Sequence, residues 1–304
     1  MDDPARALSS CVAPDDDSLL IGGGFWPRSI DRRTPGLSYW PDGAFGTIAL
    51  RLSKARDEFQ MMVEAAAGAL TPGGTLYLFG GNDEGIASAG RRLGDTFDAV
   101  ETLHTKYHSR VFAARGAKSG LKTALSDWRS TFGFHVGEAN FSHVTYPGVF
   151  ASGRLDEGTR FLLETMPAVG GAVLDFACGS GPVAQVLTRR HGDARLTLAD
   201  IDAVSLEAAK ENVPGAPSYQ ITRLRDLPDA KYDAIVSNPP IHQGVEQSFA
   251  VLRDFLATAP DYLATGGEVF IVVQRTVPVA KLAGGLKLRK HASDDAFTVW
   301  ALHR

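Results

Sequence analysis

The stretch VLDFACGSGPV, residues 173–183, decides the fold of this chain. An apolar run typical of a buried strand leads into Gly179 and Gly181, and Pro182 suits the first position of a helix. Glycine lets the backbone turn sharply and approach a ligand, because it carries no Cβ. Asp200 ends the next expected strand about 20 residues further on, where a carboxylate can accept hydrogen bonds from ribose hydroxyls. The stretch therefore predicts a nucleotide-binding α/β fold.

The loop by itself leaves two cofactors open. Gly179, Gly181 and Ala184 also satisfy the GxGxxG/A fingerprint of dinucleotide-binding proteins, so an NAD enzyme stays an alternative at this point. Asp175, however, lies inside the strand, where NAD proteins usually keep an apolar residue. Its carboxylate suits the ammonium group of a ligand, directly or through water. This feature favours S-adenosylmethionine.

Strands and helices alternate along the second half of the chain. The expected strands are GAVLDFA, ARLTLADI, YDAIVSN and GEVFIVVQ, with helices between them, and LKLRKHA and AFTVWALHR follow as a closing antiparallel hairpin. Parallel neighbours need crossover helices, so this alternation predicts a parallel sheet that is covered on both faces.

The first half shows a weaker rhythm of helix and strand, and we find in it no strand-Gly-x-Gly loop followed by an acidic residue. Residues 116–148 show no sustained periodicity, which indicates an inter-domain connection. We therefore predict a first α/β domain at residues 1–120, a connection at 121–140 and a second domain at 141–304. Residues 1–17 mix Asp, Ala, Pro and Ser, and we expect them to be mobile or poorly packed.

Composition excludes several classes of protein. The chain has 304 residues, of which 44% are hydrophobic and 22% charged, enough for two globular cores. Cys11 and Cys178 lie far apart and form no CxxC or Cys/His cluster, so we expect neither a disulfide framework nor a metal site. The chain lacks both an apolar membrane span and signal-peptide features, which predicts a cytoplasmic protein. A net charge of -4 leaves RNA binding open, because binding needs only a local basic surface.

The segment SNPPI, residues 237–241, follows the expected strand YDAIV. Asn238 offers a side-chain carbonyl and Pro239 a backbone carbonyl, while the two successive prolines stiffen the loop. A planar NH₂ group fits this pair of acceptors. Holding both hydrogens lets the nitrogen rehybridise toward a methyl donor, and the stabilisation grows as positive charge develops. We reject a covalent cytosine-C5 mechanism, because Cys178 lies in the cofactor loop and not after a proline in the target loop, and we interpret it as a packing residue.

Together these motifs resemble those of class I S-adenosylmethionine-dependent methyltransferases, and within them the RsmC-like ribosomal RNA guanine-N2 methyltransferases. The segments that carry the resemblance are PGVFASGRLDEGTRFLLETM (147–166), VLDFACGSG (173–181), LTLADID (196–202) and YDAIVSNPPIHQG (232–244). The first half is similar to the degenerate N-terminal copy that this family carries, in YWP (39–41), EFQMMVEAAAGAL and GGNDEGI (80–86). The likeness covers most of residues 38–304.

The resemblance implies a Rossmann-like, seven-stranded methyltransferase sheet with a C-terminal antiparallel hairpin. It also implies a smaller, degenerate methyltransferase-like α/β domain before it, which binds no cofactor. The implied activity is transfer of a methyl group from S-adenosylmethionine, without a metal, to the N2 amine of a guanine in small-subunit (16S) ribosomal RNA. The RNA is free or part of a ribosomal subunit assembly intermediate. The alternatives are a large-subunit ribosomal RNA guanine, a protein glutamine or a DNA adenine as acceptor, or a non-catalytic RNA-binding relative.

Site residues carry over from the family position by position. Those for the cofactor are Asp175, Gly179 and Gly181 around the methionine part, Asp200 at the ribose and Ile201 on the adenine. Those for the target amine and its base are Asn238, Pro239, Pro240, Ile241 and His242.

Two departures from the family pattern matter. Ala177 replaces the first glycine of the cofactor loop, and Ile241 replaces the aromatic residue that stacks on a flipped base. We therefore expect Ile241 to pack on the base itself, or Phe150 or Phe297 to take the aromatic role. An RNA-binding face would draw on basic residues, for which the candidates are Lys118, Lys122, Arg129, Arg275, Lys281, Lys287, Arg289, Lys290 and His291.

Overall fold

The computed structural model describes residues 2–190, 192–241, 246–283 and 286–304. The chain divides into two compact units, Met1–Arg129 and Ser130–Arg304. The second unit therefore begins earlier than predicted, because residues 130–140, expected in the connection, belong to it. They enter the antiparallel hairpin of β7 (Ser130–Val136) and β8 (Ala139–Thr145). The hairpin is held by buried aromatic residues, with Phe134 stacked on Phe141 and both packed in the core of the second unit.

The second unit is built on one sheet of seven strands. Their order is β11-β10-β9-β12-β13-β15-β14, and neighbours run parallel except at β15, which is antiparallel to β13 and β14. The strands are β9 (Ala172–Phe176), β10 (Arg195–Asp200), β11 (Ser218–Gln220), β12 (Tyr232–Ser237), β13 (Leu263–Gln274), β14 (Lys287–Ser293) and β15 (Phe297–His303). The predicted seven-stranded Rossmann-like sheet with its closing hairpin is confirmed.

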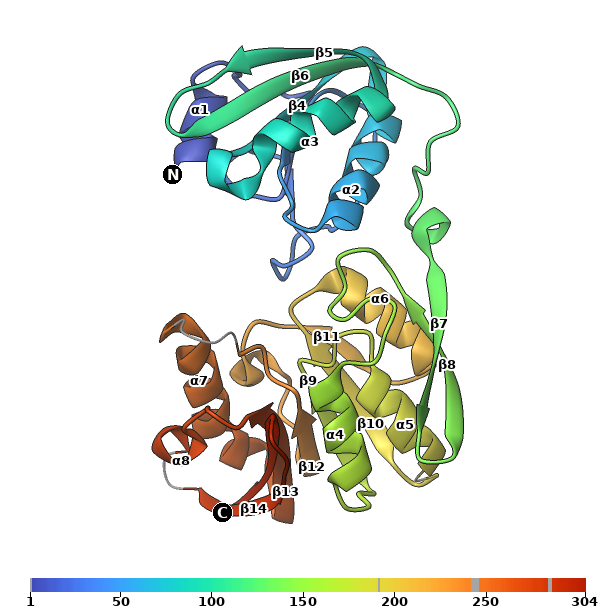
Figure 1. Ribbon diagram of the computed structural model, residues 1–304, viewed down its shortest axis with the longest axis vertical. Helices are drawn as coiled ribbons and strands as arrows, with labels where there is room; N and C mark the ends of the chain where they lie inside the picture. Colours follow the sequence, from blue (N-terminus) through green and yellow to red (C-terminus); the bar gives the residue numbers. More distant parts are fainter. Residues whose placement is uncertain (1, 191, 242–245, 284–285) are drawn as a thin grey trace. The chain divides into compact units, whose positions relative to one another are not determined.

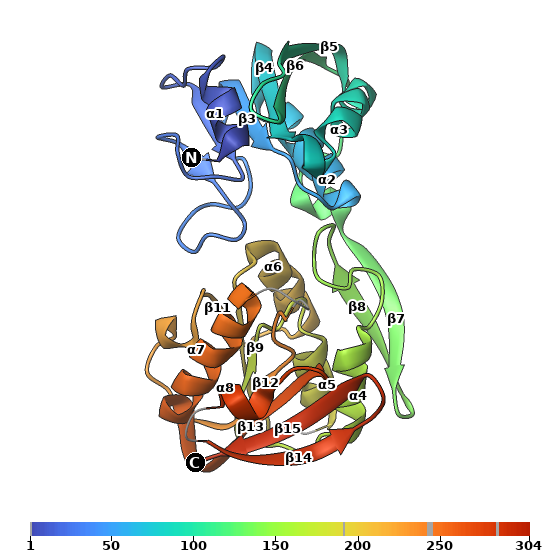
Figure 2. The same ribbon diagram turned by 60° about the vertical axis from the view of Figure 1, so that its left-hand side comes forward.

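Helices cover both faces of this sheet (Figure 1, Figure 2). They are α4 (Glu157–Thr165), α5 (Pro182–Arg190), α6 (Ala203–Asn212), α7 (Glu246–Tyr262) and α8 (Val279–Leu282). Successive side chains of a strand point to opposite faces. In β9, Val173 accordingly packs in the same core as Leu162 of α4, whereas Leu174 packs in the other core with Phe255 of α7. Because both faces are buried, the strands of this sheet read as nearly continuous apolar runs.

Strand β9 lies where the strand order of the sheet reverses. The chain passes from β9 to β10 on one side and later enters β12 on the other. In open α/β sheets, ligands bind at this point, beyond the carboxyl ends of the strands. Ser237 at the end of β12 donates from Oγ to the backbone oxygen of Phe176 at the end of β9, over 2.7 Å. The glycine loop and the Asn-Pro-Pro loop therefore begin side by side.

The first unit has a six-stranded sheet of order β2-β1-β3-β4-β6-β5. Its strands are β1 (Ser18–Ile21), β2 (Ser29–Ile30), β3 (Phe45–Arg51), β4 (Leu70–Gly81), β5 (Phe97–His104) and β6 (Ser109–Ala117), with helices α2 (Arg56–Gly68) and α3 (Ile86–Arg92). The first four strands run parallel, and β6 is antiparallel to both β4 and β5. Order and direction match β10-β9-β12-β13-β15-β14 of the second unit. The smaller methyltransferase-like domain is thus confirmed.

This shared topology also identifies, in the first unit, a counterpart of the cofactor loop and its acidic residue, which the sequence analysis missed. Residues 22–24, all glycine, follow β1, the counterpart of β9, and Asp31 follows β2, the counterpart of β10. The described residues between the two strands form no helix. A Cβ at Gly22 would lie 2.9 Å from the Cβ of Arg51, which forms a 2.6 Å ion pair with Glu84. In the first unit, therefore, an arginine packs against the glycine loop.

The expectation that the first 17 residues are poorly packed is wrong for α1 (Asp3–Ser9). Asp2 caps this helix by accepting a hydrogen bond from the backbone N–H of Ala5 over 2.9 Å. Ala7 and Leu8 are fully buried, and the helix packs against β4 and β6. With Pro4 and Ala5 also buried, four of the seven residues of this short helix dock it. In the described part of the chain, no helix combines the length and the apolar character that a membrane crossing requires.

Candidate active site

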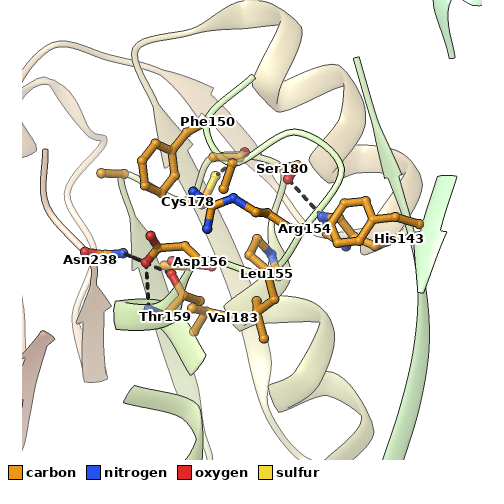
Figure 3. Close-up of a pocket in the computed structure, with 16 residues that line it drawn as sticks. His143, Phe150, Arg154, Leu155, Asp156, Thr159, Cys178, Ser180, Val183 and Asn238 are labelled. Carbon is orange, nitrogen blue, oxygen red and sulfur yellow. Dashed lines mark hydrogen bonds between the residues drawn. The ribbon is translucent and has the colours of Figure 1, made fainter. Parts of the chain in front are cut away.

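A pocket opens at the carboxyl ends of β9 and β12, in the second unit (Figure 3). Four segments line it: the cofactor loop after β9 with the start of α5, the start of the Asn-Pro-Pro loop after β12, the residues that lead into and begin α4, and the β7–β8 hairpin. Its polar and aromatic lining residues include Phe150, Arg154, Asp156, Thr159, Asp175, Ser180, Asn238 and His143. Predicted residues from distant parts of the sequence, Phe150, Asp175, Ala177, Gly179 and Asn238, are thus brought together at one pocket.

The cofactor loop has a left-handed backbone at three positions. The φ angles are 57° at Ala177, 55° at Gly179 and 81° at Gly181. A Cβ at Gly181 would lie 3.2 Å from the Cβ of Ala209 in α6, so glycine there also permits close packing of this helix. Cys178 is buried, and its burial raises the pKa of its thiol well above the usual value. A thiol that stays protonated suits the packing role that we assigned to it.

Asp175 is a buried carboxyl group in the wall of this pocket. Only 1% of the residue is exposed, and Oδ2 accepts one hydrogen bond, from the backbone N–H of Ala184 over 3.1 Å. Burial raises the pKa of Asp175 to about 7, while the bond from Ala184 opposes the rise and the nearby charge of Asp200 adds to it. No ion pair of Asp175 is found among the residues that the structure describes. A cationic ligand would supply the missing counter-charge.

Asp200 ties the cofactor loop to the end of β10. Its Oδ2 accepts from the backbone N–H of Gly179 over 2.8 Å, and its Oδ1 accepts from that of Asp202 over 2.9 Å. Burial raises the pKa of Asp200 as well, against the lowering effect of these bonds. Each oxygen retains a lone pair for a ribose hydroxyl. Ile201 lies next to it and is 39% exposed, although neither Asp200 nor Ile201 lines the pocket itself.

Asn238 connects the Asn-Pro-Pro loop to the start of α4. Its amide nitrogen Nδ2 donates to Oδ2 of Asp156 over 2.9 Å and to Oγ1 of Thr159 over 3.0 Å. These bonds use both amide hydrogens, and among the residues that the structure describes no donor is found for the carbonyl oxygen. Pro239 is buried, whereas Pro240 is exposed. The sequence analysis missed both partners of Asn238, although Asp156 directly before an apolar-periodic segment is a helix-start signal.

The residues expected at the target base differ in exposure. Ile241 is partly buried and packs against the core between the sheet and α7. Phe150 is 63% exposed and is one of the residues that line the pocket (Figure 3). Phe297 packs under α4, since a Cβ at Gly158 would lie 3.1 Å from its ring. Of the two aromatic candidates, Phe150 is therefore the accessible one. His242 lies outside the described residues.

A buried polar network behind the cofactor loop also escaped the sequence analysis. His143 of β8 is fully buried, with Nε2 2.8 Å from Oγ of Ser180 and Nδ1 2.7 Å from Oε1 of Gln185. Asn212 donates from Nδ2 to the backbone oxygens of Val144 and Ser180, each over 2.9 Å. Burial lowers the pKa of His143, against the raising effect of its bond with Gln185, which favours the neutral ring. The network holds the β7–β8 hairpin against the cofactor loop.

The basic residues expected to contact RNA make several contacts within the protein. Arg289 lies 3.6 Å from the carboxylate of Glu268, and Lys290 lies over the ring of Trp300. The first three candidates, from Lys118 to Arg129, belong to the first unit and the others to the second. Their role in RNA binding stays a prediction. In the described ranges, no group of three or more His, Cys, Asp or Glu residues is arranged to hold a metal ion.

Comparison with known proteins identifies the family. The methyltransferase small domain matches residues 140–299, and the N-terminal domain that accompanies it matches residues 31–132. The chain is 30% identical over 298 residues to ribosomal RNA small subunit methyltransferase C of Pseudomonas aeruginosa (strain LESB58), covering 90% of this chain and 85% of the relative. The chain belongs to this methyltransferase family. The resemblance stated from the sequence is therefore confirmed.

A second relative with the same name, from Stutzerimonas stutzeri (strain A1501), is 31% identical over 275 residues, which cover 85% of this chain and 82% of the relative. Among solved structures, the 16S rRNA guanine-N2 methyltransferase (RsmC) of Thermus thermophilus, in complex with S-adenosylmethionine and guanosine, matches with a TM-score of 0.82 and 21% identity. The match covers 100% of this chain and 92% of the other. The match shows that this chain and the Thermus thermophilus protein share the same two-domain fold.

Proposed function

We propose that this chain transfers a methyl group from S-adenosylmethionine to the N2 amine of a guanine in small-subunit (16S) ribosomal RNA. The observation that carries the proposal is the hydrogen bonding of the Asn238 side chain. Both of its amide hydrogens are bonded within the protein, at the pocket. Its carbonyl oxygen is left to accept a hydrogen bond from a planar amine.

The residues of the pocket fit the cofactor. S-adenosylmethionine supplies an activated methyl group on a sulfonium sulfur together with an ammonium group and a ribose. The left-handed turn at Gly179 lets the backbone approach the methionine part, and Asp175 provides a buried carboxylate for the ammonium. Asp200 would accept from the ribose hydroxyls, and the exposed side chain of Ile201 would pack on the adenine.

The chain's own part in the reaction is to hold and polarise the target amine. The exocyclic amine of guanine is a poor nucleophile, because its lone pair is delocalised into the ring. Oδ1 of Asn238 and the backbone oxygen of Pro239 accept its two hydrogens, which favours a tetrahedral nitrogen. Positive charge develops on that nitrogen as the methyl group is transferred, so both acceptors bind the transition state more strongly than the ground state.

The names of the relatives support the choice of RNA. Both are small-subunit ribosomal RNA methyltransferases, and the solved relative was crystallised with guanosine. Phe150, exposed at the pocket, offers a ring on which an unstacked base can stack. We further propose that the substrate is free ribosomal RNA or a subunit assembly intermediate, in which the target base is accessible, and that the reaction takes place in the cytoplasm.

Transfer of labelled methyl from S-adenosylmethionine tests the proposal. Deproteinised small-subunit RNA, large-subunit RNA and mature small subunits serve as acceptors, and the labelled RNA is digested to nucleosides for mass spectrometry. We expect N2-methylguanosine from the small-subunit RNA, with a rate that falls by about 10²- to 10³-fold in Asn238→Ala, the size of effect seen for one oxyanion-hole donor. Asn140→Ala, an exposed asparagine outside the pocket, is the control.

Other outcomes identify other functions. Label in a protein glutamine, in adenine or in large-subunit RNA alone would contradict the proposed acceptor while keeping the chemistry of Asn238. If calorimetry detects no binding of S-adenosylmethionine, the chain is a non-catalytic RNA-binding relative.

A further inference from the structure

We infer that Asp156 is a positioning residue for methyl transfer: it fixes the side-chain amide of Asn238 in the orientation that presents its carbonyl oxygen to the target amine. The inference deepens the proposed function and rests on it for the identity of the amine. Its structural part, the orientation of the Asn238 amide, stands on the contacts of Asp156 alone.

An asparagine side chain can turn by 180° and exchange its oxygen for its NH₂ group at little cost in shape. Only one of the two orientations can accept a hydrogen bond from a substrate amine. Oδ2 of Asp156 lies 2.9 Å from Nδ2 of Asn238, and an ionised carboxylate can only accept. In the reversed orientation two oxygens would face each other at this distance. Asp156 therefore excludes the unproductive orientation.

Thr159 supports this choice but does not make it. Its Oγ1 lies 3.0 Å from Nδ2 of Asn238 and takes the second amide hydrogen. A hydroxyl group, however, donates as readily as it accepts, so it would also tolerate the reversed amide. The carboxylate of Asp156 is the partner that distinguishes the two orientations.

The start of α4 holds Asp156 itself in place. The same Oδ2 atom accepts from the backbone N–H of Thr159 over 2.9 Å, so Asp156 is the N-cap of the helix. Leu162 and Leu163 of α4 are fully buried, and Gly158 lies so close to Phe297 that even a methyl group would crowd the ring. The amide of the loop is thus oriented by a rigid helix terminus.

The charge of Asp156 also acts on the reaction. A carboxylate that accepts from an amide N–H polarises the amide and makes its oxygen a stronger acceptor. This effect grows in importance as positive charge develops on the target nitrogen. We therefore expect the loss of Asp156 to lower kcat more than it changes KM or the affinity for S-adenosylmethionine.

Asp156→Ser separates positioning from capping. Serine is a good N-cap, so α4 keeps its start, but its short hydroxyl group does not enforce the orientation of Asn238. We expect kcat for RNA methylation to fall by about 10- to 100-fold, as for a lost charge-assisted hydrogen bond, with the Kd of S-adenosylmethionine within about twofold. Asp156→Asn keeps the size of the side chain but can donate as well as accept and carries no charge, so it should also lower kcat. Glu157→Ser removes an equal charge from the next, exposed residue and is the matched control.

Two further measurements distinguish positioning from a general structural effect. In the Asn238→Ala background, Asp156→Ser should cause no additional loss of kcat, because Asp156 acts through Asn238. If Asp156→Ser lowers kcat in the Asn238→Ala background by as large a factor as it does in the wild-type enzyme, the inference is overturned. The side-chain amide NMR signals of Asn238, assigned by their absence in Asn238→Ala, should move toward solvent-exposed positions in Asp156→Ser but not in Glu157→Ser. Unmoved signals would overturn it whether or not RNA proves to be the substrate.

Discussion

Replacing Asp175 by asparagine is expected to stabilise the second unit near neutral pH and to weaken the binding of S-adenosylmethionine. Burial raises the pKa of this carboxyl group from 3.8 to about 7. One pKa unit corresponds to about 1.4 kcal/mol, so keeping the buried group ionised costs about 4 kcal/mol. The asparagine variant carries no such cost.

The sign follows from proton binding. Between pH 4 and pH 7 the folded protein holds a proton on Asp175 that the unfolded chain has lost, so the stability of the wild type falls as the pH rises through this window. From pH 5 to pH 7.5 this loss amounts to about 2 to 3 kcal/mol. The Asp175→Asn variant does not show this loss of stability, because its amide does not titrate. The buried amide adds a constant cost of about 1 to 3 kcal/mol, which does not depend on pH.

The assay is urea unfolding of the full chain at pH 5 and pH 7.5, following the transition that shifts when S-adenosylmethionine is added. The difference in unfolding free energy between variant and wild type should move in favour of the variant by about 2 to 3 kcal/mol between the two pH values. Calorimetry at pH 7.5 should show the affinity for the cofactor reduced by about 10- to 100-fold. A stability difference that stays constant with pH would refute the reasoning about Asp175.

Three other substitutions test the site. Ala177→Gly should raise the free energy of unfolding by up to about 1 kcal/mol in urea titrations, because it relieves a left-handed backbone worth ~1–2 kcal/mol at an entropic cost of ~0.5–1. Phe150→Ala should raise KM for RNA by about 5- to 100-fold through lost stacking, with an unchanged Kd for S-adenosylmethionine by calorimetry. His143→Leu should lower the free energy of unfolding by about 1 to 3 kcal/mol, measured by urea titration, because Ser180 and Gln185 lose a buried partner.

The parts of the fold that the sequence predicted are those set by local patterns. The strand from Val173 to Phe176, the glycine loop and the acid at Asp200 form one contiguous strand-loop-helix-strand unit, and the structure places them as such. Alternating strands and helices determine a parallel sheet, because crossover connections leave few topologies. The antiparallel pairing of β14 and β15 follows from the short connection between them, because parallel neighbours need a long crossover.

The parts that escaped prediction depend on contacts between distant residues. Asp156 is recognisable as a helix cap, yet its bond to Asn238 joins residues 82 positions apart. The β7–β8 hairpin lacks a strong periodic signal, and its place is decided by the Phe134–Phe141 stack and by His143 against Ser180. Such partners become visible only once the sheet brings them together.

The structure accommodates both departures from the family pattern. Ala177 adopts the left-handed φ of 57° that a glycine would take, so the loop keeps its path at the cost of local strain. Ile241 turns toward the core beside α7, where an apolar side chain is stabilised by burial. Phe150, from the segment that leads into α4, offers an exposed aromatic ring at the pocket, and we propose that it takes the role of the missing aromatic residue. Because Asp156 belongs to the same segment, the residue that would stack on the base and the residue that orients Asn238 are placed by one element, and a change in this segment should affect base binding and methyl transfer together.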